Sequence, residues 1–344
     1  MSAPSPPPIP TPTPGVLSRL FTSVGWLLLG GVTVLAVAAA LTTFVEPPVT
    51  LPPRTAQAGA VAITTILTAL AALRVGGRIV TSTVFAATAG VASVLGGWPW
   101  LESGMVAFTC FAAAVLAVSG TRPAHRPGAL VREYAIAITV ASVGAVAAAA
   151  YQAPVRPTML TNIVSLLAML AMLWLARRIG GGVSGLGKRG GATIVAAVAV
   201  IVVGLAYSEA LRAWGSPGLV DGLAAARSTA EDRLGALPPT LELLVGFPAL
   251  VWGLATRSQL RQGWWLCGFG ALGTAGIATS LAEPGVDVGV AVLGTVYSAV
   301  LGLMIGFAIW RLDMLLTGPR GRRARRAERT KPLRPEPSRT RPLV

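Results

Sequence analysis

The chain has 344 residues, of which 53% are hydrophobic and 12% are charged, whereas soluble domains carry about 25% charged residues. So little charge cannot cover the surface of a water-soluble domain of this length, and the composition indicates that most of the chain is surrounded by lipid. The net charge of +15 does not indicate a nucleic-acid partner, because 11 of the 28 basic residues follow the last apolar run and the others lie in short connections.

The polar residues offer little for metal or nucleotide chemistry. Cys110 and Cys267 both fall inside apolar runs, which favours buried thiols over a disulfide. His125 is the single histidine and lies in a basic loop. The sequence contains no GxxxxGK[ST] motif. We therefore expect no metal site and no cofactor.

The first segment, residues 1–16, contains seven prolines and is predicted to be a disordered cytoplasmic tail. An apolar run then begins after Arg19 and continues for 26 uncharged residues to Glu46, enough to cross a bilayer. A cleaved signal peptide is the alternative, because the small residues at 36–38 resemble a cleavage region. The run is long for such a peptide, so an uncleaved span is favoured.

Nine further apolar runs complete a transmembrane domain over residues 17–315, an all-α polytopic helix bundle of about ten spans. Their expected bounds are 57–73, 79–96, 103–120, 134–151, 158–176, 192–208, 241–256, 264–281 and 287–310. Gly and Pro mark the turns between neighbouring runs where charges are sparse.

The charges of the connections predict the orientation. If residue 1 is cytoplasmic, the inner connections hold 23 basic and four acidic residues, and the outer ones hold five basic and nine acidic residues. This alternation follows the positive-inside rule and predicts that both termini are cytoplasmic. The localisation expected from it is the plasma or inner membrane.

The longest outer connection is 209–240, which contains an amphipathic segment. Ser216-Pro217 predicts a helix start, and an apolar stripe follows. This segment is a candidate lid or a docking surface for a membrane protein partner through residues 212–235; a plain connection explains it equally well.

Residues 316–344 are predicted to be a disordered, basic cytoplasmic tail. Four arginines close to the last span would contact anionic lipid in the bilayer: Arg322, Arg323, Arg325 and Arg326.

Few polar groups lie near the spans, and these are the candidate binding residues. Glu209 and Glu242 are placed near the outer surface, Pro248 predicts a kink, and Asn162 and Tyr297 are polar groups within spans. Interfacial contact and hydrogen bonds between helices are the alternative explanations.

Three functions remain open. The first is a permease- or flippase-like protein for a neutral or amphiphilic solute, with a polar cavity bounded by spans six, seven, eight and ten. Hydroxyl side chains would line its path (Thr64, Thr65, Thr81 and Thr83). The alternative is a non-catalytic membrane component of a cell-envelope or division assembly. The third, a lipid-acting enzyme, would use outer carboxylates (Glu209, Asp221, Glu231, Asp232 and Glu242). No catalytic residue is assigned.

Overall fold

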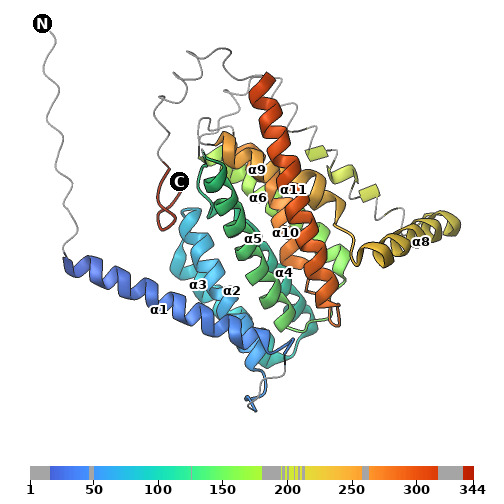
Figure 1. Cartoon of the computed structure of the whole chain (residues 1–344). Helices are drawn as coiled ribbons and strands as arrows, with labels where there is room; N and C mark the ends of the chain where they lie inside the picture. The colour runs from blue at the N-terminus through green and yellow to red at the C-terminus, as the bar shows by residue number, and fades with distance from the viewer. Residues whose placement is uncertain are drawn as a thin grey trace, which may run out of the picture.

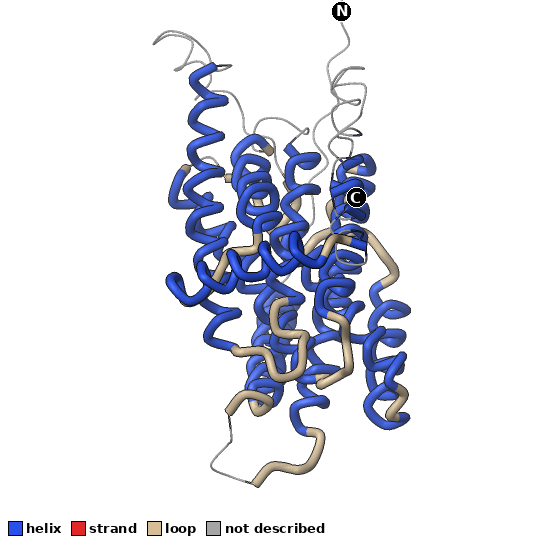
Figure 2. The backbone as a smooth tube through the Cα atoms, turned by 90° about the vertical axis from the view of Figure 1, so that its right-hand side faces the viewer, coloured by secondary structure: helices blue, strands red, loops and turns tan. Residues whose placement is uncertain are grey.

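The computed structural model of this chain describes residues 16–45, 50–124, 126–179, 214–257, 263–316 and 336–344, together with scattered positions between 195 and 210. Within these ranges the chain is helical and contains no strand (Figures 1 and 2). The helices are α1 (Val16–Leu41), α2 (Thr55–Arg74), α3 (Ile79–Gly96), α4 (Pro99–Ser119), α5 (Pro127–Ala150), α6 (Pro157–Arg178), α8 (Pro217–Leu234), the π-helix η1 (Glu242–Gly246), α9 (Phe247–Thr256), α10 (Gly263–Thr279) and α11 (Val288–Leu316).

Six of these helices are long and apolar enough to cross a membrane: α2, α3, α4, α5, α6 and α11. The shorter apolar stretches are 28–41 in α1 and 242–256 in η1 and α9. Every expected span except 192–208 coincides with one or two of these helices, and 192–208 is described only at scattered positions, which are helical. The fold is therefore the all-α bundle of a multi-pass membrane protein.

Proline sets the start of several helices. It occupies the first turn of α4, α5, α6 and α8, where its missing N–H costs no hydrogen bond and its fixed φ suits the helix. The tight turn between α3 and α4 passes through Gly97 at φ 59°, and the α10–α11 connection passes through Gly285 at φ 82°. Glycine tolerates this left-handed backbone, which is why such short connections separate these helices.

Helix α10 lies at the centre of the bundle, and every residue from Gly263 to Thr279 except Leu266 is buried. Glycines of η1 and α10 allow close approach between them and between α9 and α10: a Cβ on Gly246 would meet the backbone of Gly273, and a Cβ on Gly270 would lie 2.8 Å from Cβ of Leu250. Small residues favour helix association in lipid because they bring more atoms into van der Waals contact.

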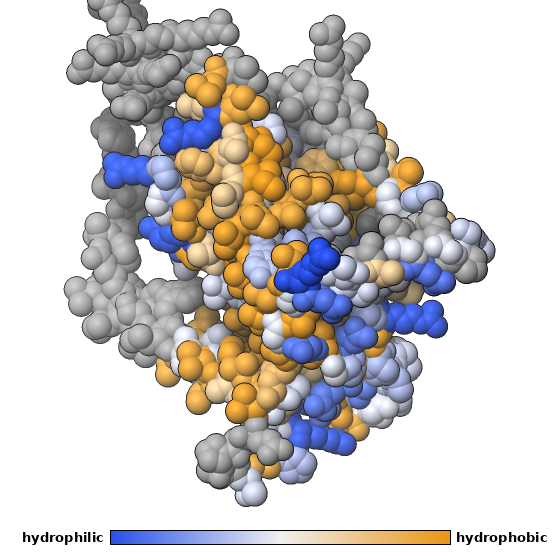
Figure 3. Space-filling view, turned by 45° about the vertical axis from the view of Figure 1, so that its right-hand side comes forward, coloured by the Kyte–Doolittle hydropathy of each residue, from blue (hydrophilic) through white to orange (hydrophobic). Residues whose placement is uncertain are grey.

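The GxxxG pair of α11 serves packing inside this one chain. A Cβ on Gly302 would lie 2.5 Å from Cβ of Phe247, and one on Gly306 would lie 2.7 Å from Cβ of Val251. The outer side of α11 carries exposed apolar side chains such as Val296, Val300 and Met304. Figure 3 shows apolar side chains over much of one face of the bundle, and lipid is the solvent that such a surface requires.

Candidate functional site

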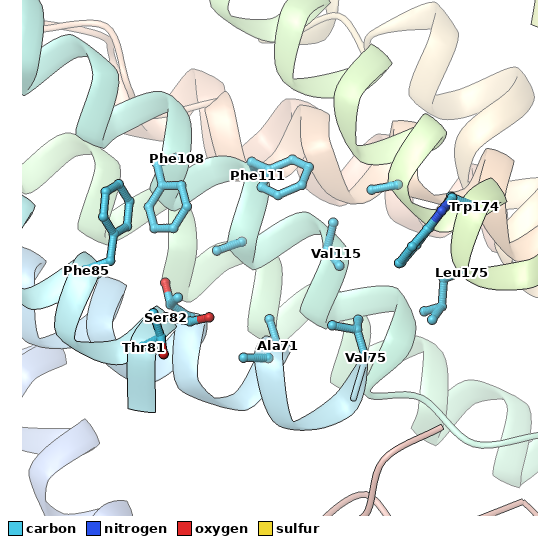
Figure 4. A pocket seen from close by; sticks show the side chains of 14 residues that line it. Ala71, Val75, Thr81, Ser82, Phe85, Phe108, Phe111, Val115, Trp174 and Leu175 are labelled. Atoms are coloured by element: carbon cyan, nitrogen blue, oxygen red, sulfur yellow. The ribbon is translucent and has the colours of Figure 1, made fainter. Parts of the chain in front are cut away.

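A cavity of about 520 Å³ opens between α2, α3, α4 and α6 (Figure 4). Its lining is mostly apolar: Thr68, Ala71, Ala72, Val75, Thr81, Ser82, Phe85, Phe108, Phe111, Ala112, Val115, Ala171, Trp174 and Leu175. The lining residues of α2, α3 and α6 lie near Arg74, Ile79 and Arg178, and those of α4 reach back to Phe108, so the cavity extends from one end of the bundle to about the middle of α4.

The rim of this cavity faces outward. Phe85 is 58% exposed and Trp174 is 52% exposed, and both rings border the open space in Figure 4. Phe85 packs edge-on against Phe108 with ring centroids 5.9 Å apart. Aromatic rims and an apolar interior suit a hydrocarbon chain entering from the side of the bundle, with the hydroxyls of Thr81 and Ser82 at its edge.

This cavity differs from the expected one. The sequence predicted a polar cavity bounded by spans six, seven, eight and ten, whereas the cavity described here is apolar and lies between α2, α3, α4 and α6. Of the four threonines expected along a path, Thr81 lines it. Thr64 instead lies 2.7 Å from the Thr109 hydroxyl and 3.2 Å from the Tyr151 hydroxyl, in a buried network between helices.

A cluster of charged residues lies at the end of the bundle where α2, α4 and α9 end and α5 begins. We call this the docked end, because residues 336–344, the docked segment, pack against it. The sequence predicts disorder for this stretch, and the structure gives it defined contacts with α2, α5 and α9. Leu343 donates its N–H to the Arg74 carbonyl at 2.9 Å.

Arg257, which follows α9, is 1% exposed and is enclosed by contacts of several kinds. Its Nη2 donates to the Thr121 carbonyl at 2.7 Å, and its guanidinium carbon lies 3.9 Å from the centre of the Trp264 ring. Its Nε lies 3.3 Å from Oε1 of Glu336 in the docked segment. A charge this deeply buried requires a counter-charge, and Glu336 supplies it.

Arg74, the last residue of α2, is also 1% exposed. Its Nε donates to the Ser119 carbonyl at 2.8 Å, while Nη1 donates to the carbonyls of Ser338 and Arg341, each at 2.8 Å. Both guanidiniums bind the backbone at the end of α4, Arg74 at the Ser119 carbonyl and Arg257 at the Thr121 carbonyl two residues further on. The two guanidiniums therefore make one positively charged site, which the docked segment covers.

Glu133 is the negative partner on the bundle itself. Its buried carboxylate accepts the Arg122 N–H at 2.9 Å and the Arg132 Nη2 at 3.0 Å. Nη2 of Arg339, in the docked segment, lies 2.6 Å from each of its oxygens. Charge-assisted hydrogen bonds of this kind are stronger than neutral ones.

Glu242 and Pro248, two of the binding residues expected from the sequence, lie in η1 and in the first turn of α9. Glu242 begins the π-helix η1 and is buried, with its side chain against Gly276 of α10. Pro248 follows directly in the first turn of α9. Because proline cannot donate to the preceding turn, the helix widens to a π-turn at the place where a kink is expected.

The other selected residues do not join these two in one site. Asn162 is half-buried in α6, and Tyr297 of α11 donates its hydroxyl to the Leu234 carbonyl at 3.1 Å. Glu209 and the four arginines expected to contact anionic lipid (Arg322, Arg323, Arg325 and Arg326) lie outside the described residues.

The charged cluster is what sequence reasoning missed. Arg74, Glu133 and Arg257 were counted as residues of inner connections, as the positive-inside rule requires. A signal was present, since Arg74 directly follows an apolar run and Glu133 is the lone acid of its connection. Their burial depends on contacts with a segment more than 200 residues away from Glu133, which no local pattern reports.

Searches with this chain against family models, curated proteins and solved structures find no match. The function is therefore inferred from the residues and geometry above.

Proposed function

We propose that this chain is a ten-span inner-membrane protein, with both termini cytoplasmic, that binds an amphiphile and moves it across the bilayer. The observation that carries the proposal is the apolar cavity between α2, α3, α4 and α6, open at its side and rimmed by Phe85 and Trp174. A volume of about 520 Å³ is within the usual range for small-molecule sites.

The charge distribution supports the orientation. With both termini inside, the docked end faces the cytoplasm, where the connections rich in Arg and Lys belong. The cavity then lies at the level of the inner leaflet, and one hydrocarbon chain of an amphiphile can enter it without leaving the hydrocarbon. The buried carboxylate of Glu242 lies at the start of η1. This is the end of the η1–α9 segment that lies away from the docked end, toward the outer leaflet.

The experiment that tests this function is a lipid-movement assay. The full chain is reconstituted in phosphatidylcholine vesicles containing a trace of fluorescent (NBD-labelled) phospholipid, and dithionite bleaches the label exposed in the outer leaflet. Moving the labelled lipid raises the bleached fraction from about half toward completeness. Vesicles with protein that bleach no further than empty vesicles would count against lipid movement.

A matched pair of variants ties that movement to the cavity. Ala171→Phe places a ring in the cavity from α6, whereas Ala135→Phe adds the same ring to an exposed position of α5. Movement should be lost in the first variant and kept in the second. Equal activity of both variants would show that the cavity is not the path.

A second candidate, a non-catalytic component of a cell-envelope or division assembly, is favoured by the position of α8. In Figure 1 this helix extends away from the rest of the bundle, and Asp221, Ser228 and Asp232 on it are exposed. Such a helix is free to meet a partner. Deleting residues 212–235 should then remove a stoichiometric partner from the protein purified in mild detergent, and a protein that purifies alone from its own membrane would exclude this candidate.

A further inference from the structure

The docked end contains a positively charged site that is formed by the bundle and covered by the docked segment. Arg74 and Arg257 supply two buried guanidiniums. Arg257 is held by the Thr121 carbonyl, which follows α4, and by the ring of Trp264 in α10. Glu336 of the docked segment brings a negative charge to this pair through its contact with Arg257. The arginine site, as we call Arg74, Arg257 and Trp264, is thus held together without the docked segment.

Glu336 matches this site incompletely. Neither of its oxygens makes a hydrogen bond, although Oε1 lies within ion-pair distance of Arg257. Among the described residues, buried donors at Nη2 of Arg74 and Nε1 of Trp264 also have no hydrogen-bond partner. Unused buried donors are costly, and Arg257, which stacks on the Trp264 ring, lies beside an acceptor with unused lone pairs. A group with more oxygens, arranged in a tetrahedron, would use more of these donors than a planar carboxylate can.

Removing the docked segment leaves the charges unequal. Glu133 would lose Arg339 but keep the Arg122 N–H and Arg132, so its charge stays compensated. Arg74 would lose both acceptors of Nη1, and Arg257 would lose its carboxylate partner. Without a counter-ion the two neighbouring cations repel each other, so an anion that takes the place of Glu336 when the segment leaves would be stabilised there.

We propose that the arginine site binds a phosphate group, and that Glu336 of the docked segment occupies it as a displaceable substitute. This deepens the proposed function and rests on it, because Val75 and Leu175, which line the cavity, lie near the ends of their helices, as Arg74 does. An amphiphile with its chain in the cavity would carry its phosphate at the docked end. Arginine suits this role because its planar donors bind phosphate in pairs.

Binding of three probes to the full chain in phosphatidylcholine nanodiscs, measured by titration calorimetry against empty nanodiscs, tests the proposal. The probes are dodecyl phosphate, dodecanol and inorganic phosphate. Glu336→Gln removes the competing charge and should raise the affinity for dodecyl phosphate at least about fivefold. Glu283→Gln, the same change at an exposed position beyond α10, should leave it unchanged. Arg257→Gln should lower it at least about tenfold, and Arg257→Lys should restore part of the loss.

The probes separate the source of the phosphate. A gain in Glu336→Gln for dodecyl phosphate alone assigns the site to a lipid headgroup, and an equal gain for inorganic phosphate assigns it to a free anion; either supports a phosphate site. Affinities that change in neither Glu336→Gln nor Arg257→Gln would overturn it. Loss of dodecanol and dodecyl phosphate binding in Ala171→Phe reports on the cavity, so the amphiphile function and the phosphate site can fail separately.

Displacement of the segment gives a second measurement that does not depend on Arg257 variants folding. Leu343→Cys places a thiol on a side chain packed against the core, and Thr340→Cys places one at an exposed position of the same segment. Saturating dodecyl phosphate should speed maleimide labelling of Cys at 343 several-fold and leave labelling at 340 unchanged. Native Cys110 and Cys267 are buried and contribute little background. An unchanged rate at 343 would show that the ligand and Glu336 do not exclude each other.

Discussion

Nη2 of Arg339 lies 2.6 Å from both carboxylate oxygens of Glu133, although 206 residues separate them in the sequence. This contact joins the docked segment to the start of α5. Glu133 is fully buried while the Arg339 side chain is 38% exposed. The pair is therefore neither a surface ion pair nor a completely desolvated one, and its contribution to stability falls between those limits.

Glu133→Gln should loosen the docked segment. The amide keeps the shape of the side chain but removes the charge that holds Arg339, so the free energy of docking should fall by about 1–2 kcal/mol, less than for a fully buried pair. Hydrogen exchange of the Leu343 amide, which donates to Arg74, measures this opening. Glu283→Gln is the control, and protection that survives in Glu133→Gln would mean that the backbone contacts to Arg74 suffice.

Gly276→Ala should destabilise the bundle. A Cβ at this position would overlap the Glu242 side chain, and overpacking of this kind costs about 1–3 kcal/mol. Thermal unfolding in detergent measures the loss. Gly104→Ala, in α4 with no atom near its added Cβ, is the control and should be neutral or slightly stabilising. Adding Glu242→Ala to Gly276→Ala should recover most of the stability, and a double variant no better than the single one would contradict this packing.

Tyr151→Phe should cost about 0.5–1 kcal/mol, since it removes one hydrogen bond to Thr64 between helices and leaves the ring in place. Thr64 retains its contacts with Thr109 and the Ala60 carbonyl. The same thermal measurement applies, with Tyr207→Phe, at an exposed position, as the control. A loss above about 3 kcal/mol would indicate that the hydroxyl supports more than this one contact.

Cysteine labelling on intact cells should confirm the orientation. Glu283→Cys lies in the α10–α11 connection and should react with a membrane-impermeant maleimide, because this connection is expected outside. Thr340→Cys, at the docked end, should react only after the cells are permeabilised. Both positions are exposed in the structure, so access to the side chain is not limiting. The reverse pattern would invert the topology and place the docked end outside.

The helical segments could be predicted because each depends on its own residues. An uninterrupted apolar run such as the one in α4 must satisfy its backbone hydrogen bonds internally in lipid, which only a helix does for a single segment. Proline and glycine then mark the ends, as Pro99 and Gly97 do between α3 and α4. The kink expected near Pro248 is a prediction of the same local kind, and the structure has the π-turn of η1 directly before the first turn of α9, where Pro248 lies.

The sequence by itself determined the all-α class, the approximate helix ends and the concentration of basic residues in alternate connections. Tertiary structure alone decided which helices border the cavity, that Glu242 packs on Gly276, and that Arg74, Arg257 and Glu133 meet the docked segment. The physical reason is range. Helix formation is governed by neighbouring residues, whereas a buried charge is tolerated only when partners from distant segments compensate it, and no local pattern records where those partners are.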